Sequence, residues 1–408
     1  MKHLLRIIGI PLLLAACTQT EDVTPQNLAE GEVPVPISFG AYLTAASTRG
    51  TTYYDMTAST LTSTGFGVFA KVNDATVQNF IYNEQVSWSG SAWSYSPLKY
   101  WPEATNTLSF YAYAPYAADG SAIDCLTAIP SGGSEDPKIG YTAATDYPTQ
   151  GTDLLWATNT NQSKPTSTPK ETKLTFNHAC VRLGLKVIAN YDETDTEEKT
   201  KILIKEVKIQ SGGDAVSLNA LRTSGTLDLT STTQYKPEWN VTESTAFSLP
   251  TLIDNNHYMN TDLEYTPLQT IGIPNSGQDE WGICARSAED KTVEAQFASL
   301  KPGVTTTAKP LQAPVDGSTY YYTLVPNPAA YGNSFNIPIE ITYHVITLDS
   351  RLPNGYSDIE ATRSATATIT DFKAGHIYTL LLRIGLKHID AKCEVSNWTN
   401  STEESTTL

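Results

Sequence analysis

His178 and Cys180 are the residues whose types and spacing most resemble a metal site. They are two residues apart, so both side chains would lie on one face of a strand. Imidazole and thiolate groups both bind transition metals. The adjacent Phe176 and Ala179 favour a different interpretation, a hydrogen-bonded buried histidine next to a core thiol. We therefore expect no metal at this position.

No other stretch predicts catalysis. The oxygen-rich loop with Asp254, Asn256 and Asp262 has Met259 where a calcium loop would need a glycine, so a solvated turn is favoured. The nucleophile elbow G-x-S-x-G, the zinc motif H-E-x-x-H, the phosphate loop and the dinucleotide fingerprint are missing from the sequence. The sequence therefore predicts a protein that is not an enzyme and has no cofactor.

Aromatic residues are crowded in the stretch WSGSAWSYSPLKYWP, residues 88–102. Flat rings can stack on sugar faces, so this cluster could bind a glycan. The alternative is a β-hairpin that buries its tryptophans in a core and ends at Pro102. The cluster consists of Trp88, Trp93, Tyr95, Tyr100 and Trp101.

The N-terminus predicts export and lipidation. Lys2 and Arg6 precede an apolar run, residues 7–16, that is too short to span a bilayer. It ends in Leu-Ala-Ala-Cys17, which resembles the bacterial lipobox, where the cysteine is acylated before the signal peptide is removed. Several acyl chains on Cys17 would anchor the protein firmly to a membrane. The acidic TQTED that follows resembles the surface-export signal of Bacteroidetes lipoproteins.

Charge and cysteine content agree with this location. The formal charge is −16, and basic clusters are missing, so nucleic acid is not an expected partner. Four of the five cysteines remain if Cys17 carries lipid, and they can be either disulfides or free thiols. These four are Cys125, Cys180, Cys284 and Cys393.

Residues 33–43 alternate between apolar and other side chains, which is typical of a strand with one buried face. Pro34 and Pro36 lie on the other face and cannot donate hydrogen bonds, so the strand should lie at a sheet edge. Burial of the apolar row would contribute up to roughly 8–15 kcal/mol. Arg49, the first cation after Cys17, is either a surface residue or a protease site. The apolar row is Val33, Val35, Ile37, Phe39, Ala41 and Leu43.

The rest of the chain predicts an all-β protein with two β-sandwich domains. Tyr, Trp, Thr and Ser are abundant, Gly and Pro recur throughout, and 408 residues suit two domains. The charged loop at residues 192–201 is a natural boundary. We predict a signal peptide at 1–16, a lipidated propeptide at 17–49 that includes the edge strand, sandwich domains at 37–190 and 191–398, and a polar tail at 399–408. Strands are expected at 65–71, 108–114, 154–157, 174–188, 202–209, 225–229, 320–325, 337–345, 365–369, 377–386 and 389–395.

Several stretches, taken together and in their order along the chain, resemble the Bacteroidetes fimbrillin family. These are the FimA-like and Mfa-like pilins of type V fimbriae. The resemblance extends from Ile37 to Trp398 and includes the lipobox. The stretches are YWPEATNTLSFYAYAP (100–115), DLLWA (153–157), LTFNHACVRLGLKV (174–187), GTLDL (225–229), YYTLVPNP (321–328) and FKAGHIYTLLLRIGLKHIDAKCEVSNW (372–398).

The resemblance implies two tandem transthyretin-like β-sandwich domains and assembly by strand exchange. In this family an arginine-specific protease removes the lipid and the first strand, and a neighbouring subunit supplies a replacement. Here the cut would follow Arg49 and leave Gly50 as the new N-terminus. The candidate donor strand is Ile389, Ala391, Cys393 and Val395, although this strand could instead complete its own sandwich.

The expected function is therefore that of a fimbrial shaft, tip or anchor protein that serves adhesion. Its partners would be other pilin subunits, the outer membrane through lipid on Cys17, and a host glycan or protein receptor. The expected location is the outer membrane surface, and the fimbria after processing. The alternative is a surface lipoprotein that binds glycans through the aromatic cluster and does not polymerise.

Overall fold

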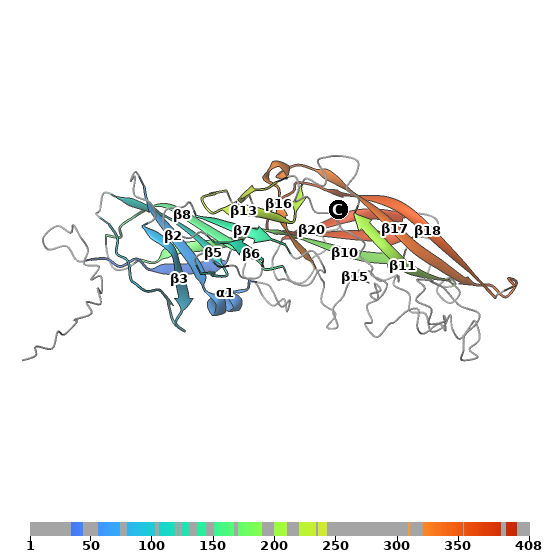
Figure 1. The fold of residues 1–408 in the computed structure, drawn as a ribbon, viewed down its shortest axis with the longest axis horizontal. Helices are drawn as coiled ribbons and strands as arrows, with labels where there is room; N and C mark the ends of the chain where they lie inside the picture. Colours follow the sequence, from blue (N-terminus) through green and yellow to red (C-terminus); the bar gives the residue numbers. More distant parts are fainter. Residues whose placement is uncertain are drawn as a thin grey trace, which may run out of the picture.

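The structure is a computed structural model. It describes residues 34–43, 56–73, 80–102, 106–118, 121, 125–129, 137–143, 151–166, 170–189, 200–209, 220–233, 236–242, 309–310, 321–353, 355–384 and 389–397. These residues form an elongated, all-β molecule (Figure 1), which confirms the predicted fold class. The predicted strands at 65–71, 108–114, 202–209 and 337–345 are present with small shifts at their ends.

The first sheet has seven strands and occupies one end of the molecule (Figure 1). Its strands are β1 (Phe39–Leu43), β2 (Phe66–Val72), β3 (Ile81–Trp88), β4 (Trp93–Ser94), β5 (Thr107–Ala114), β8 (Leu155–Ser163) and β9 (Thr172–His178). The order across the sheet is β1-β9-β8-β5-β2-β3-β4. β1 is thus a terminal strand, and it pairs in parallel with β9.

A four-stranded sheet follows near the middle of the molecule (Figure 1). It contains β6 (Leu126–Ala128), β7 (Lys138–Thr142), β13 (Ser224–Asp228) and β14 (Glu238–Asn240), in the order β14-β13-β7-β6. β7 and β13 are far apart in the sequence but pair directly in antiparallel register.

Two further sheets form the other end. The larger contains β10 (Val181–Ala189), β12 (Leu221–Arg222), β15 (Lys309–Pro310), β16 (Tyr322–Pro326), β19 (His376–Ile384) and β20 (Ile389–Asn397). The smaller contains β11 (Thr200–Ile209), β17 (Phe335–Leu348) and β18 (Tyr356–Ile369). A short 3-10 helix, Pro328–Ala330, follows β16.

The buried side chains form two clusters. The smaller cluster lies on one side of the first sheet and includes Ile37, Phe39, Phe66 and Phe110. The larger begins on the opposite side with Phe69, Tyr113 and Trp156 and continues through the four-stranded sheet into the far end of the molecule. Because the second cluster is continuous, the sheets are packed against one common core.

The stretch predicted as one strand, 174–188, is two strands. β9 ends at His178 and belongs to the first sheet, whereas β10 begins at Val181 and pairs with β16 and β19. The chain therefore passes from one sheet to another at Ala179 and Cys180. The predicted division of the chain at residue 190 stays a prediction, but the pairing of β10 with β16 and β19 and the pairing of β7 with β13 both cross it.

The helix α1 (Ala58–Thr64) is an element that the sequence did not predict. Its sequence, ASTLTST, is rich in residues with weak helix preference. The Thr57 side chain caps it by accepting a hydrogen bond from the backbone N–H of Thr60 at 3.1 Å. Leu61 is its buried residue. In the part of the chain that the structure describes, no helix has both the length and the apolar character needed to cross a bilayer.

Candidate functional site: the first strand and its groove

The apolar row of the first strand faces the core, as its alternation predicts. Ile37 and Phe39 are 0% and 1% exposed, and Val35, Ala41 and Leu43 are partly buried against the same cluster. Residues 34–43 therefore occupy a groove lined by apolar side chains.

Both sides of this segment are hydrogen-bonded. From Ser38 onward it pairs with β9, and Thr172 donates to the Ser38 carbonyl at 2.7 Å. Before Ser38 it pairs with the segment after β4: Ile37 donates to the Lys99 carbonyl, and Trp101 donates to the Val35 carbonyl, both at 2.9 Å. The first segment thus bridges β9 and the chain that follows the opposite terminal strand of the sheet. Loss of residues 34–43 would leave backbone groups on both sides without partners.

Phe39 has the most specific environment in the groove. Its ring lies 5.4 Å from Tyr95, 5.6 Å from Phe110 and 6.3 Å from Phe66, measured between ring centroids. The Tyr95 hydroxyl donates to the Ile37 carbonyl at 3.0 Å, and burial is the main reason that its pKa is raised to about 12. Tyr95 therefore stays protonated at neutral pH and can keep donating this hydrogen bond.

Several predicted site residues lie outside the described residues: Cys17, Val33, Arg49 and Gly50. The roles assigned to them stay predictions. The candidate donor strand is β20, which pairs in antiparallel register with β19 at the edge of its own sheet. Ala391 and Cys393 are partly buried against the larger core cluster, and Val395 is exposed. This position agrees with the alternative that β20 completes its own sheet.

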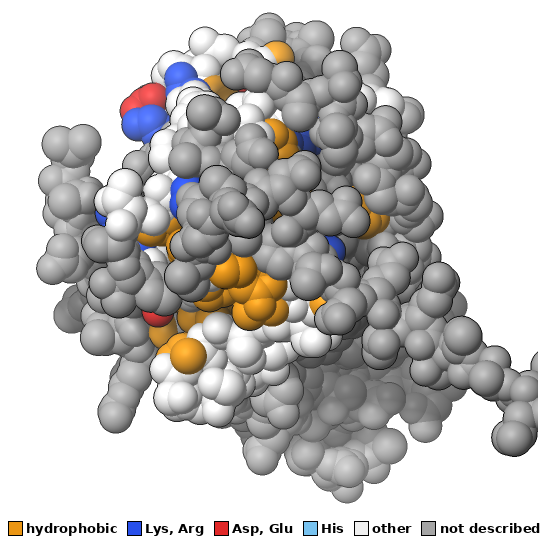
Figure 2. Space-filling model, turned by 90° about the vertical axis from the view of Figure 1, so that its left-hand side faces the viewer, with side chains coloured by type: hydrophobic (Ala, Val, Ile, Leu, Met, Phe, Trp, Pro, Cys, Tyr) orange, Lys and Arg blue, Asp and Glu red, His pale blue; other side chains and the backbone are white. Residues whose placement is uncertain are grey.

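The aromatic cluster of residues 88–101 is divided between core and surface. Trp101 is 4% exposed and packs on Phe110, with 5.7 Å between ring centroids, so it is not available to a ligand. Trp93 is partly buried against the same core. Trp88 is 38% exposed, and its ring packs edge-on against the ring of Trp93. Figure 2 shows that hydrophobic side chains also reach the surface at this end of the molecule. The hairpin interpretation therefore describes most of this cluster.

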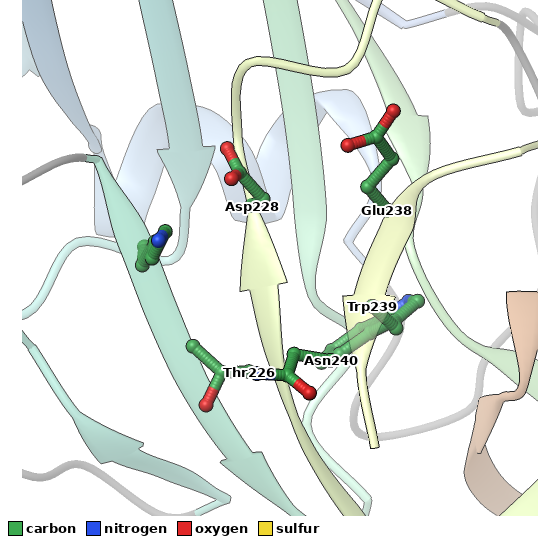
Figure 3. A pocket seen from close by; sticks show the side chains of 6 residues that line it. Thr226, Asp228, Glu238, Trp239 and Asn240 are labelled. Carbon is green, nitrogen blue, oxygen red and sulfur yellow. The ribbon is translucent and has the colours of Figure 1, made fainter.

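A polar hollow of about 310 Å³ lies on the four-stranded sheet. Figure 3 shows Asp228 and Glu238 on neighbouring strands, with Thr226 and Asn240 below them. Lys138, Asp228 and Glu238 are direct cross-strand partners in the sheet register. Asp228 thus faces an opposite charge on Lys138 and a like charge on Glu238, on the solvated face of the sheet, and we assign this row no separate role.

His178 is hydrogen-bonded, as the sequence predicts, but it is partly rather than fully buried. Its Nδ1 is 2.8 Å from Asp153 Oδ1, and the backbone N–H of Met56 donates to Asp153 Oδ2 at 3.0 Å. Burial alone would raise the pKa of the fully buried Asp153, but His178, Arg182 and the Met56 N–H outweigh it and hold the pKa below its ordinary value. Asp153 thus joins the start of β8, the end of β9 and the chain before α1.

We expect Asp153→Ala to lower the free energy of unfolding by about 3 kcal/mol, because it leaves a buried partner uncompensated. Asp349→Ala is the matched control, since Asp349 pairs with the highly exposed Arg351 and should show no measurable change. Urea denaturation measures both. Equal effects of the two variants would contradict the structural importance of the Asp153 pair.

The same carboxylate predicts a pH effect. A group whose pKa is lowered by folding adds stability that is fully present above the ordinary aspartate pKa, about 3.9, and is lost as the pH falls through the lower folded value. The stability difference between the natural chain and Asp153→Asn should therefore be constant near neutral pH and shrink below about pH 4. Urea titrations at several pH values test this, and a difference that grows on acidification would refute it.

Three of the four remaining cysteines lie in the described residues, and all three are free thiols: Cys125, Cys180 and Cys393. Burial raises the pKa of Cys180 well above its usual range and that of Cys393 to about 12. Cys180 and Cys393 are therefore protonated and unreactive at neutral pH. The described residues also contain no group of three or more His, Cys, Asp or Glu arranged to bind a metal.

The comparisons with known proteins place this fold in the class of fimbrial proteins. A crystal structure of a fimbrial protein from Bacteroides vulgatus ATCC 8482 aligns with a TM-score of 0.56 and 18% identity, over 90% of this chain and 100% of that one. The fimbrium subunit Fim1C of Phocaeicola vulgatus is 22% identical over 99% of this chain and 98% of its own length. The model of the fimbrillin-like family matches residues 48–398, and the chain belongs to that family. Membership implies assembly with other pilin subunits.

Proposed function

We propose that this chain is a structural subunit or an accessory tip or anchor protein of a type V fimbria, and that it assembles by strand complementation. The observation that carries this proposal is the position of residues 34–43. Their apolar row fills a groove between β9 and residues 99–101, and Ile37 and Phe39 are fully buried in it. A strand at the edge of a sheet and near the chain start can be exchanged without rethreading the fold.

The proposed pathway begins with export and lipidation on Cys17, which anchors the protein to the outer membrane with its folded part at the cell surface. A protease then cuts after Arg49, leaves Gly50 as the new N-terminus and releases the strand. A donor strand from another pilin enters the groove, and the fimbria mediates adhesion to a host glycan or protein. Labelling with palmitate should mark the natural chain but not Cys17→Ala.

Limited cleavage at Arg49 tests the assembly step. Cleavage should convert the monomer into a species that forms oligomers when a donor strand is present, whereas Arg49→Gln should stay intact and monomeric. Size-exclusion chromatography with light scattering measures the mass, and N-terminal sequencing identifies the cut. A chain that is cut after Arg49, loses residues 17–49 and stays monomeric with every donor subunit offered would overturn strand complementation.

A further inference from the structure

The groove has a slot shaped for one aromatic ring. Phe39 fills it completely, and the three rings of Phe66, Tyr95 and Phe110 surround it within 6.3 Å between centroids. Protein interiors are densely packed, so a much smaller side chain would leave a cavity in this slot.

The positions beside this slot differ in burial. Two residues before Phe39, Ile37 is fully buried. Two residues after it, Ala41 is only partly buried, so this position does not restrict the side chain in the same way. The groove therefore favours a strand with an aromatic residue and a large aliphatic residue two positions to one side of it.

The chain's own β20 fits a different place. Ala391 and Cys393 lie opposite Leu382 and Leu380, which are large and fully buried, so the small side chains of β20 complement the large ones of β19. The apolar row of β20 is Ile389, Ala391, Cys393 and Val395, and it contains no aromatic residue.

No register of β20 satisfies the groove. If Ile389 occupied the Phe39 slot, an aliphatic side chain would replace the ring. In one strand direction Lys387 would then occupy the fully buried Ile37 position, where its charge would be buried. Trp398 is the one nearby ring, but it belongs to the opposite row, which includes Asp390, Lys392 and Glu394.

We infer that the groove left by residues 34–43 selects a strand from a different pilin, and that this chain does not polymerise with itself through β20. The partner strand carries an aromatic residue for the Phe39 slot and a large aliphatic residue two positions away for the Ile37 position. This inference rests on the proposed strand exchange.

Peptide exchange tests the inference. The full chain is cut after Arg49, and fluorescence anisotropy follows the entry of labelled peptides. The probes are the natural sequence 33–44, the same peptide with Phe39→Ala, the same peptide with Tyr42→Ala as an outward-facing control, and the sequence 387–398. We expect the natural and Tyr42→Ala peptides to bind within threefold of each other, and the Phe39→Ala and 387–398 peptides to bind at least 100-fold more weakly.

The possible failures are distinguishable. If the 387–398 or the Phe39→Ala peptide binds as tightly as the natural sequence, the groove does not select an aromatic residue and the inference is wrong. If no peptide binds the cut chain, not even the natural sequence, the proposed strand exchange is wrong, and so is the inference about selectivity that rests on it.

Discussion

Deletion of residues 17–49 without a replacement strand is expected to lower the free energy of unfolding by roughly 5–9 kcal/mol. Ile37 and Phe39 are fully buried and contribute about 1.5–3 kcal/mol each, and the three partly buried residues of the row add the rest. This value is smaller than the one expected from the sequence, because only Ile37 and Phe39 are fully buried among the members of the row that the structure describes. Area-based values of this kind are upper bounds.

Denaturation followed by tryptophan fluorescence measures this loss, because Trp101 packs beside the groove and donates to Val35. Deletion of residues 17–32 alone is the matched control, since it leaves the described strand intact and should not change stability. Addition of the 33–44 peptide in excess should restore most of the loss by mass action. An unchanged denaturation midpoint after deletion of 17–49 would show that the strand does not stabilise the sheet.

Phe39→Ala is expected to lower the free energy of unfolding by about 3–5 kcal/mol, which is the usual range for truncation of a buried phenylalanine. Phe39→Leu keeps much of the volume and should lose about 1.5 kcal/mol or less. Both variants keep the backbone of β1 and its pairing with β9, so they isolate the contribution of the aromatic slot.

Tyr42→Ala is the control for Phe39→Ala. Tyr42 lies on the same strand but is 46% exposed, so its truncation should change stability by no more than about 0.5 kcal/mol. Urea denaturation of the three variants gives the comparison directly. If Tyr42→Ala and Phe39→Ala lower the free energy of unfolding by similar amounts, the two faces of β1 contribute equally to stability. That result would contradict a groove that binds the inner face of the strand.

The local patterns of the sequence predicted the first strand well. The alternation at 33–43 and the prolines at 34 and 36 indicated an edge strand with one buried face. The described part of the segment has the buried face, and β1 is the terminal strand of its sheet, but residues 35–37 pair with residues 99–101 on the other side. Periodicity depends on nearest neighbours along the chain, so it can identify a buried face. It cannot identify what covers that face, and the rings of Phe66, Tyr95 and Phe110 come from three separate stretches.

Other features depended on contacts distant in sequence. The sequence predicted a satisfied His178, but Asp153, 25 residues earlier, could not be identified as its partner. The break between β9 and β10 was also missed, although the apolar positions change from even (Leu174, Phe176) to odd (Val181, Leu183) across it. The sequence does not show that the two strands join different sheets. Helix α1 lacks an apolar period and owes its position to the Thr57 cap and to one buried leucine.

The passage of the chain from β9 to β10 has a mechanical consequence. A strand held in the groove would lie beside β9, two residues join β9 to β10, and β10 runs parallel to β19, which borders β20. Figure 1 shows β10 and β20 lying along the length of the molecule. If subunits join by the proposed strand exchange, a pull on the strand in the groove would load its ladder with β9 in shear, so that many hydrogen bonds resist together rather than one after another. Tension in a filament would pass through Ala179 and Cys180 as a covalent tether, and the subunit would act as a stiff link.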